Sequence, residues 1–366
     1  MNLGIVKHLS IILIFTSLLG CTGNNIGPGS NNNVPGGNDE GWAVPTQYVL
    51  DGGVGKDGIR SIDNPAFLTV AEADFINDDE LVIIVNFQGI IKVYPHKVLD
   101  YHEIVNDVFQ DSLLTISYCP LTGTAAAWKG NFSGINTDFG VSGLLYNNNL
   151  ILYDRETDSY WSQMKFFSIF GTKVFDEVDF VPVVETTWGT FKQMNLPAEV
   201  LRGNVGSSTN YSSYPYGNYR TDNNYLLFPL EEPDDRLGAK ERVLFVVDED
   251  QDVEMVAINY PSPDLVQNVV VSNDVAYIRN NALNLMVALP TITTDGVTHT
   301  FEYKHNALPV ILIDEEGNEW DVFGKAVSGP RTGEQLTPIY SMVGYFFPIS
   351  SIFREANIIN YRPIGG

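Results

Sequence analysis

The sequence predicts a mainly β protein (α+β) with few short helices, built from two β-rich repeats packed as a pseudo-symmetric duplicated domain. Short runs of Val, Ile, Leu, Phe and Tyr recur between Gly, Asn, Asp and Pro, whereas long helical periodicities are scarce. The chain has 366 residues, of which 44% are hydrophobic and 12% aromatic. That length and composition predict a globular protein with a sizeable core.

An internal repeat is the second basis of this prediction. The run VIIV at 82–85 is echoed by VLFV at 243–246, and ILYD at 151–154, with Trp161, is echoed by ILID at 311–314, with Trp320. SIFG at 168–171 has a counterpart in AVSG at 326–329. We therefore expect a first repeat at 57–202, a Tyr-rich inter-repeat segment at 203–237 and a degenerate second repeat at 238–362.

Turn residues place the individual elements of the first repeat. Gln88-Gly89 separates the apolar runs 81–87 and 90–94, and Gln110-Asp111 separates 105–109 from 113–118. Each pattern predicts a β-hairpin with a two-residue turn. Residues 95–99 begin with Pro and predict one helical turn. Further strands are expected at 150–153 and 181–184.

The N-terminus has the features of a bacterial lipoprotein signal. Lys7 precedes an apolar run at 9–19, which is too short to span a bilayer and leads into Leu-Gly-Cys at 19–21. We expect a signal peptide at 1–20, lipidation of Cys21 (palmitate among its acyl chains) and a flexible Gly/Asn-rich tether at 21–41. The predicted localisation is the cell envelope, on the outer membrane or the periplasmic face.

Charge limits the partners of the chain. The 21 Lys and Arg stand against 45 Asp and Glu, a net charge of −24. Removing Lys7 with the signal leaves 20 − 45 = −25. Such a chain lacks the basic surface that nucleic acid requires and is repelled by anionic lipid. The expected membrane partner is therefore the bilayer that holds the lipid on Cys21, and no protein partner is predicted.

Several motifs together resemble one known family, the domain of unknown function 3179 (DUF3179) family. They are YHEIVND at 101–107, YCPLTGTA at 118–125, FGVSGLLYN at 139–147, YDRET at 153–157, WSQ at 161–163 and YPYG at 214–217. The resemblance covers roughly residues 55–350. It implies an exported or lipid-anchored protein and supplies no established reaction. Many members look like Cys-Pro-Leu-Cys where this chain has Thr122, so the resemblance does not support dithiol exchange here.

The second predicted hairpin gathers polar residues around one cysteine. A two-residue turn at 110–111 pairs Asn106 with Thr115 and, farther along, His102 with Cys119. Three interpretations remain open. The first is a copper or zinc site formed by Cys119, His102 and His96. The second is a thiol hydrolase or transferase with Cys119 as nucleophile, His102 as base and Asn106 orienting the ring. The third is a buried, inert thiol.

A second polar group surrounds Asp154 and Arg155. Arg binds planar anions through two hydrogen bonds, so a pocket for a carboxylate or a sugar is one interpretation, and a structural ion pair is the other. The residues assigned to such a ligand site are Ser142, Asn147, Asp154, Arg155, Trp161 and Gln163.

The sequence favours a lipid-anchored extracytoplasmic protein that binds a small ligand or metal ion near Cys119 and His102. Two alternatives remain: an enzyme with a cysteine nucleophile, and a structural or assembly lipoprotein without a reaction. The sequence does not decide whether the chain is an enzyme.

Overall fold

The computed structural model describes residues 40–132, 134–203, 209–230, 232–248, 250–259 and 268–359. The predicted signal peptide, the predicted lipidation residue Cys21 and all but the last two residues of the predicted tether lie outside this part. The described chain is mainly β, with short α-helices α1 (His96–His102), α2 (Trp188–Gln193) and α3 (Phe346–Ile352). The predicted fold class is confirmed to this extent. No helix in the described ranges is long and apolar enough to cross a membrane.

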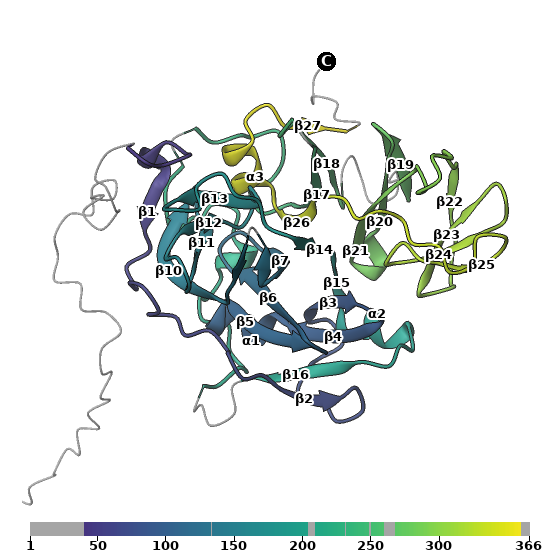
Figure 1. The fold of residues 1–366 in the computed structure, drawn as a ribbon, viewed down its shortest axis with the longest axis horizontal. Coiled ribbons are helices and arrows are strands. Elements are labelled where there is room, and N and C mark those ends of the chain that lie inside the picture. The colour runs from purple at the N-terminus through teal and green to yellow at the C-terminus, as the bar shows by residue number, and fades with distance from the viewer. Residues whose placement is uncertain are drawn as a thin grey trace, which may run out of the picture.

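The largest sheet has eight strands, which come from both halves of the chain (Figure 1). In spatial order its strands are β19 (Val269–Ser272), β20 (Val275–Asn280), β21 (Leu285–Pro290), β15 (Val183–Thr187), β3 (Leu81–Phe87), β4 (Ile90–Pro95), β16 (Glu199–Gly203) and β2 (Ala66–Thr69).

Two further sheets belong to the N-terminal half, and the first of them packs against β3 and β4 of the eight-stranded sheet. One has the order β14 (Phe180–Val181), β7 (Thr124–Lys129), β6 (Ser112–Cys119) and β5 (Ile104–Phe109). The other has the order β1 (Val49–Asp51), β10 (Phe139–Tyr146), β11 (Asn149–Asp154), β12 (Tyr160–Ser162) and β13 (Phe167–Phe170).

The C-terminal half supplies two further four-stranded sheets. One has the order β26 (Ser341–Tyr345), β17 (Arg242–Val247), β18 (Val253–Ala257) and β27 (Asn357–Ile358). The other, β22 (Phe301–Tyr303), β23 (Val310–Asp314), β24 (Glu319–Asp321) and β25 (Ala326–Ser328), lies at the opposite end of the molecule from β1 and β10 (Figure 1). The remaining elements are a small ribbon of β8 (Asn131–Phe132) and β9 (Ile135–Asn136) and the 3-10 turns η1 (Thr46–Tyr48), η2 (Tyr219–Thr221) and η4 (Asn281–Leu283).

The β14-β7-β6-β5 sheet lies between two hydrophobic cores, which is why its strands are buried on both faces. One face, with Cys119 and Trp128, packs against Trp161 of β12 and Phe245 of β17. The opposite face, which includes Ile116, packs against residues of β3 and β4. Cys119 is therefore placed inside the molecule, near the junction of three sheets.

Both hairpins predicted from turn residues are confirmed. β3 pairs with β4 around Gln88-Gly89, whose φ values of 54° and 82° are those of a type I′ turn. β5 pairs with β6 around residues 110–111 in the predicted register, with Asn106 opposite Thr115. The expected strand at 181–184 is instead divided between β14 and β15, because Pro182 has no N–H to donate to a ladder.

Two four-stranded groups share one pairing scheme. In β15-β3-β4-β16 the first two pairings are antiparallel and the last is parallel. The group β26-β17-β18-β27 repeats these directions. The halves also pair with each other: Glu185 of β15 lies opposite Met286 of β21, and Tyr345 N of β26 donates to Thr122 O beside β7 at 2.8 Å.

Candidate functional site: a cleft beside helix α1

His102 does not lie opposite Cys119, and that predicted pairing is wrong. His102 is the last residue of α1, and β5 begins at Ile104. Between them Glu103 has φ 55° and ψ −32°, so the chain leaves the helix through a sharp bend, and the β5–β6 ladder starts with Ile104 opposite Ser117. The cross-strand partner of Cys119 is Thr124 of β7.

The residues assigned to a Cys–His–Asn arrangement have separate partners. His102 Nδ1 lies 2.8 Å from Arg60 O and Nε2 lies 2.7 Å from Tyr211 OH. A carbonyl can only accept, so Nδ1 carries the proton and Nε2 accepts from the tyrosine. Asn106 joins β5 to β10, donating to Phe139 O at 2.9 Å and accepting from Thr115 Oγ1 at 2.7 Å.

Cys119 is a buried thiol. Its Sγ donates to Asn148 O at 3.7 Å, and the side chain is 1% exposed. Burial, and next the carboxyl of Glu103, raise the pKa of Cys119 to about 11. The thiol form therefore predominates at neutral pH, whereas a cysteine nucleophile needs the thiolate.

His96, the third residue assigned to a metal, lies apart from the other two. Its Nε2 is 2.8 Å from Glu185 Oε2, and its ring packs on Tyr118 with centroids 4.2 Å apart. Within the described ranges, no three His, Cys, Asp or Glu side chains come together as a group that could hold a metal ion. The structure thus does not assemble Cys119, His102 and His96 into one centre.

Four residues assigned to a ligand site have partners within the protein. Ser142 Oγ donates to Ile151 O at 2.5 Å, and Asn147 Nδ2 donates to Ser351 O at 3.2 Å. Arg155 is held by Asp138 at 3.0 Å and by Asp63 at 3.2 Å. Gln163 donates to Ser117 Oγ at 2.9 Å and accepts from Thr124 Oγ1 at 2.6 Å.

The other two, Asp154 and Trp161, close a loop. Trp161 Nε1 donates to Asp154 Oδ2 at 2.9 Å, and Thr157 N donates to Oδ1 of the same carboxylate. Trp320 Nε1 donates to Asp314 Oδ2 at the same 2.9 Å in the C-terminal half.

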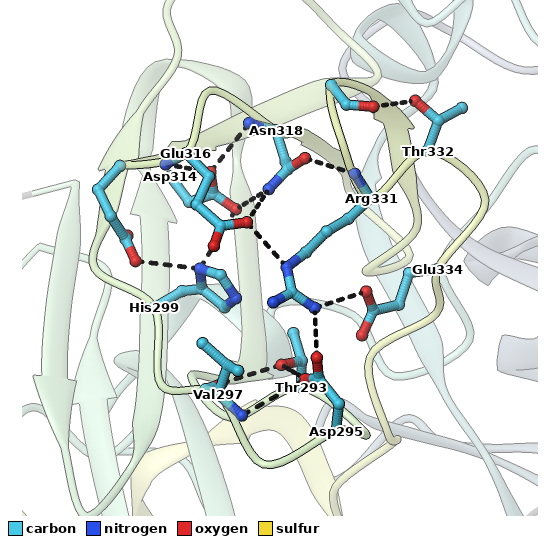
Figure 2. Close-up of polar contacts among 12 residues, drawn as sticks. Thr293, Asp295, Val297, His299, Asp314, Glu316, Asn318, Arg331, Thr332 and Glu334 are labelled. Carbon is cyan, nitrogen blue, oxygen red and sulfur yellow. Dashed lines mark hydrogen bonds and ion pairs between the residues drawn. The ribbon is translucent and has the colours of Figure 1, made fainter.

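Figure 2 shows the surroundings of Asp314, where Asn318 donates to this carboxylate and accepts from the backbone N of Arg331. Asp154 and Asp314 are thus loop-forming carboxylates whose oxygens are engaged by their own loops.

The cleft beside α1 contains His96 and, with it, functional candidates that the sequence predictions missed. We call it the α1 cleft; it has about 320 Å³ of space free of atoms, part of it open to solvent. Helix α1 supplies one wall, and residues 211–220 of the Tyr-rich segment supply the other. The lining includes Glu80, His96, Lys97, Asp100, Tyr211, Tyr214 and Arg220.

His96 and Asp100 lie four residues apart and therefore share one face of α1. Both are 3% exposed. Asp100 Oδ2 lies 3.3 Å from Arg220 Nη2, and Asp100 Oδ1 has no hydrogen-bond partner in the described structure. Burial, and next Glu80, raise the pKa of Asp100 to about 7, against the opposing effect of Arg220. Burial lowers the pKa of His96, so its ring is neutral at neutral pH.

Glu185 lies behind His96 on β15. Neither of its carboxylate oxygens, nor His96 Nε2, has a partner of hydrogen-bonding geometry among the described residues. Arg242 of the C-terminal half approaches Glu185 Oε2 to 3.7 Å. His96 Nε2 and Glu185 Oε2 nevertheless contact each other at 2.8 Å, so Asp100 Oδ1 is the acceptor of the cleft that has no partner among the described residues. An unpaired buried polar group costs about 1–3 kcal/mol.

The other end of α1 carries a second missed candidate, Glu103. Its side chain is 7% exposed, and burial raises its pKa to about 8. Non-Gly residues with positive φ cost free energy and concentrate at functional sites. The signal available in the sequence was the motif itself, since Glu103 directly follows His102 in YHEIVND.

The motifs at 101–107, 118–125 and 214–217 meet around α1. Tyr219 OH donates to Leu121 O at 2.9 Å, and Tyr101 OH donates to Ser213 O at 2.6 Å, so the Tyr-rich segment is fastened over both the helix and the Cys119 turn. A family model described as a protein of unknown function (DUF3179) matches residues 56–355. The chain belongs to the DUF3179 family. No curated protein and no solved structure matches it. The DUF3179 match spans both halves, including every residue of the α1 cleft.

Proposed function

We propose that this DUF3179 protein binds a small polar ligand in the α1 cleft. The observation that carries the proposal is the buried, unpaired Asp100 Oδ1 at the wall of an open cleft. His96 supports it, because it is buried on the same helix as Asp100 and lines the same cleft. The predicted ligand function is kept, and its location moves from a His102–Cys119 pair to the opposite face of α1.

A thermal-unfolding panel tests the proposal. Glucose, sodium acetate, glycine and methylammonium chloride would be added separately to the wild-type chain and to Asp100→Asn, against sodium chloride of equal ionic strength. Asp179→Asn is the matched control, because Asp179 is exposed and pairs with Lys129 away from the cleft. We expect at least one probe to raise the Tm of the wild type and the control, but not of Asp100→Asn. The proposal would be contradicted if no probe shifted the Tm of the wild type differently from that of Asp100→Asn.

We further propose that the protein is anchored in the cell envelope through lipid on Cys21. The Lys7 n-region, the apolar run at 9–19 and the Leu-Gly-Cys sequence support this. Metabolic labelling with a radioactive fatty acid would be expected to mark the wild type and not Cys21→Ser. Equal labelling of the two would contradict lipidation at this residue.

We also propose that the two halves derive from one duplicated unit, with boundaries near 57–202 and 238–362. The shared strand-pairing scheme supports this, as do the paired Asp–Trp contacts at 2.9 Å. Gly171 and Gly329 occupy corresponding places, with φ values of 101° and 93°. A Cβ on Gly171 would clash with Ser159, and a Cβ on Gly329 would clash with Asn318, and each of these residues lies two positions before the Trp of its repeat. In this proposal, Asp100 with its unpaired Oδ1 belongs to α1 of the first copy.

A further inference from the structure

We propose that the ligand of the α1 cleft carries a protonated amine, which binds the carboxylate of Asp100 at Oδ1. This inference rests on the proposed function, which it makes more specific. The cleft wall has an unmet acceptor in Asp100 Oδ1, and an acceptor is satisfied only by a ligand that donates hydrogen bonds. An ammonium group donates three and accepts none.

The structure already holds one cation in this manner. The guanidinium carbon of Arg220 lies 3.6 Å from the centroid of the Tyr214 ring, and Arg220 Nη2 lies 3.3 Å from Asp100 Oδ2. A carboxylate combined with an aromatic face is the usual environment of a bound cation. The side chain of Arg220 is 40% exposed, so it occupies the mouth and leaves Oδ1 of the same carboxylate unpaired.

The other cation of the cleft is occupied elsewhere. Lys97 Nζ donates to Phe75 O at 2.8 Å and to Glu80 Oε2 at 2.9 Å. Burial, and next Glu80, still disfavour the charge of Asp100, since its pKa is raised despite Arg220. A positive group beside Oδ1 would favour the charged form of Asp100, whereas an anion there would disfavour it further.

Three probes that share a methyl group separate the ligand classes. Saturation-transfer NMR on the full chain would compare methylammonium, acetate and methanol, which are cationic, anionic and neutral. We expect transfer to methylammonium to exceed transfer to the other two by at least fivefold in the wild type and in Asp179→Asn. Asp100→Asn should abolish the difference.

The variant Arg220→Ala provides a second, independent test of the proposed amine site. Arg220 competes with the ligand for Asp100, so its removal should lower the Kd of methylammonium severalfold. Weaker binding in Arg220→Ala would show that Arg220 itself holds the ligand, and it would overturn the amine assignment.

The pH dependence has a defined sign. Protonation of Asp100 removes the attraction for a cation, so methylammonium binding should weaken as the pH falls from 8 to 6. The titratable and charged groups around Asp100 are those of Glu80, His96, Lys97, Tyr118, Tyr211, Tyr214, Tyr216, Arg220 and Tyr345. Asp100→Asn should remove most of this dependence, and an unchanged dependence would contradict the assignment.

Failure of the inference and failure of the proposed function give different results. Binding of acetate or methanol that requires Asp100 would leave ligand binding in place and refute the amine. No transfer to any of the three probes would also refute the amine, and the thermal-unfolding panel would then decide whether the cleft binds anything.

Discussion

Glu103 combines a positive φ with a buried carboxyl group, and its titration should be visible in the stability of the whole protein. Its pKa rises from 4.5 to about 8 on folding. Folding therefore favours the protonated form, and the stability that this gives is complete below about pH 4.5 and lost as the pH rises through 8. Between pH 5 and 8 the wild type should lose about 1.4 kcal/mol per pH unit relative to Glu103→Gln. Urea unfolding at several pH values measures this, and parallel curves for the two proteins would contradict it.

Lys92 offers a test of a buried ion pair between two sheets. Its Nζ lies 2.9 Å from both oxygens of Asp107 and 3.0 Å from Val108 O, and both side chains of the pair are less than 8% exposed. Lys92→Met leaves the Asp107 carboxylate with Tyr94 OH and Val108 N as its donors. We expect a loss of about 3–5 kcal/mol in the free energy of unfolding, because a buried charge remains uncompensated.

The matched control for that substitution is Lys192→Met. Lys192 pairs with Asp78 at the surface, where the side chains are 43% and 74% exposed. Exposed pairs contribute less than about 1 kcal/mol, so the urea midpoint should move little. An equal loss in the free energy of unfolding for the two substitutions would contradict a larger contribution from the Lys92–Asp107 pair.

The turn that directly follows strand β25 depends on Gly329. Its φ is 93°, and a Cβ there would lie 2.6 Å from Asn318 Oδ1. Gly296 has a similar φ of 83° with open space around it. Gly296→Ala should cost about 1–2 kcal/mol from the backbone alone, and Gly329→Ala about 1–3 kcal/mol more from the clash. Chemical denaturation of the two variants would show the difference, and equal losses would contradict the role of Asn318.

The helices, strands and turns also show how much of the fold the sequence could predict. Apolar runs around two-residue turns predicted both hairpins, and the register of the second, because these depend on neighbours a few residues apart. The register could not be extended to His102, because His102 belongs to α1 and the chain bends at Glu103 with a positive φ that no Gly or Asn signals. The α1 cleft was out of reach for another reason: Arg220 meets Asp100 across 120 residues of sequence.

For the whole molecule, the pairing of strands between halves predicts a single cooperative unfolding transition. β15 meets β21 of the other half, and β26 lies beside β7. Trp320 is the one Trp of the C-terminal half, and the other four Trp lie in the N-terminal half. Fluorescence of Trp320→Phe therefore reports on the N-terminal half, and its urea midpoint should equal the midpoint from circular dichroism of the same variant, which reports on both halves. Two separate midpoints would show that the halves unfold independently.

The exchange of neighbours between the halves also has a consequence for synthesis. As the chain leaves the ribosome, its N-terminal half emerges first, with the edge of β15 that later meets β21 unpaired. Open sheet edges are templates for pairing with other chains. A nascent or truncated product that ends before β21 and β26 would therefore be prone to aggregate, and the C-terminal half would serve the first as an intramolecular chaperone.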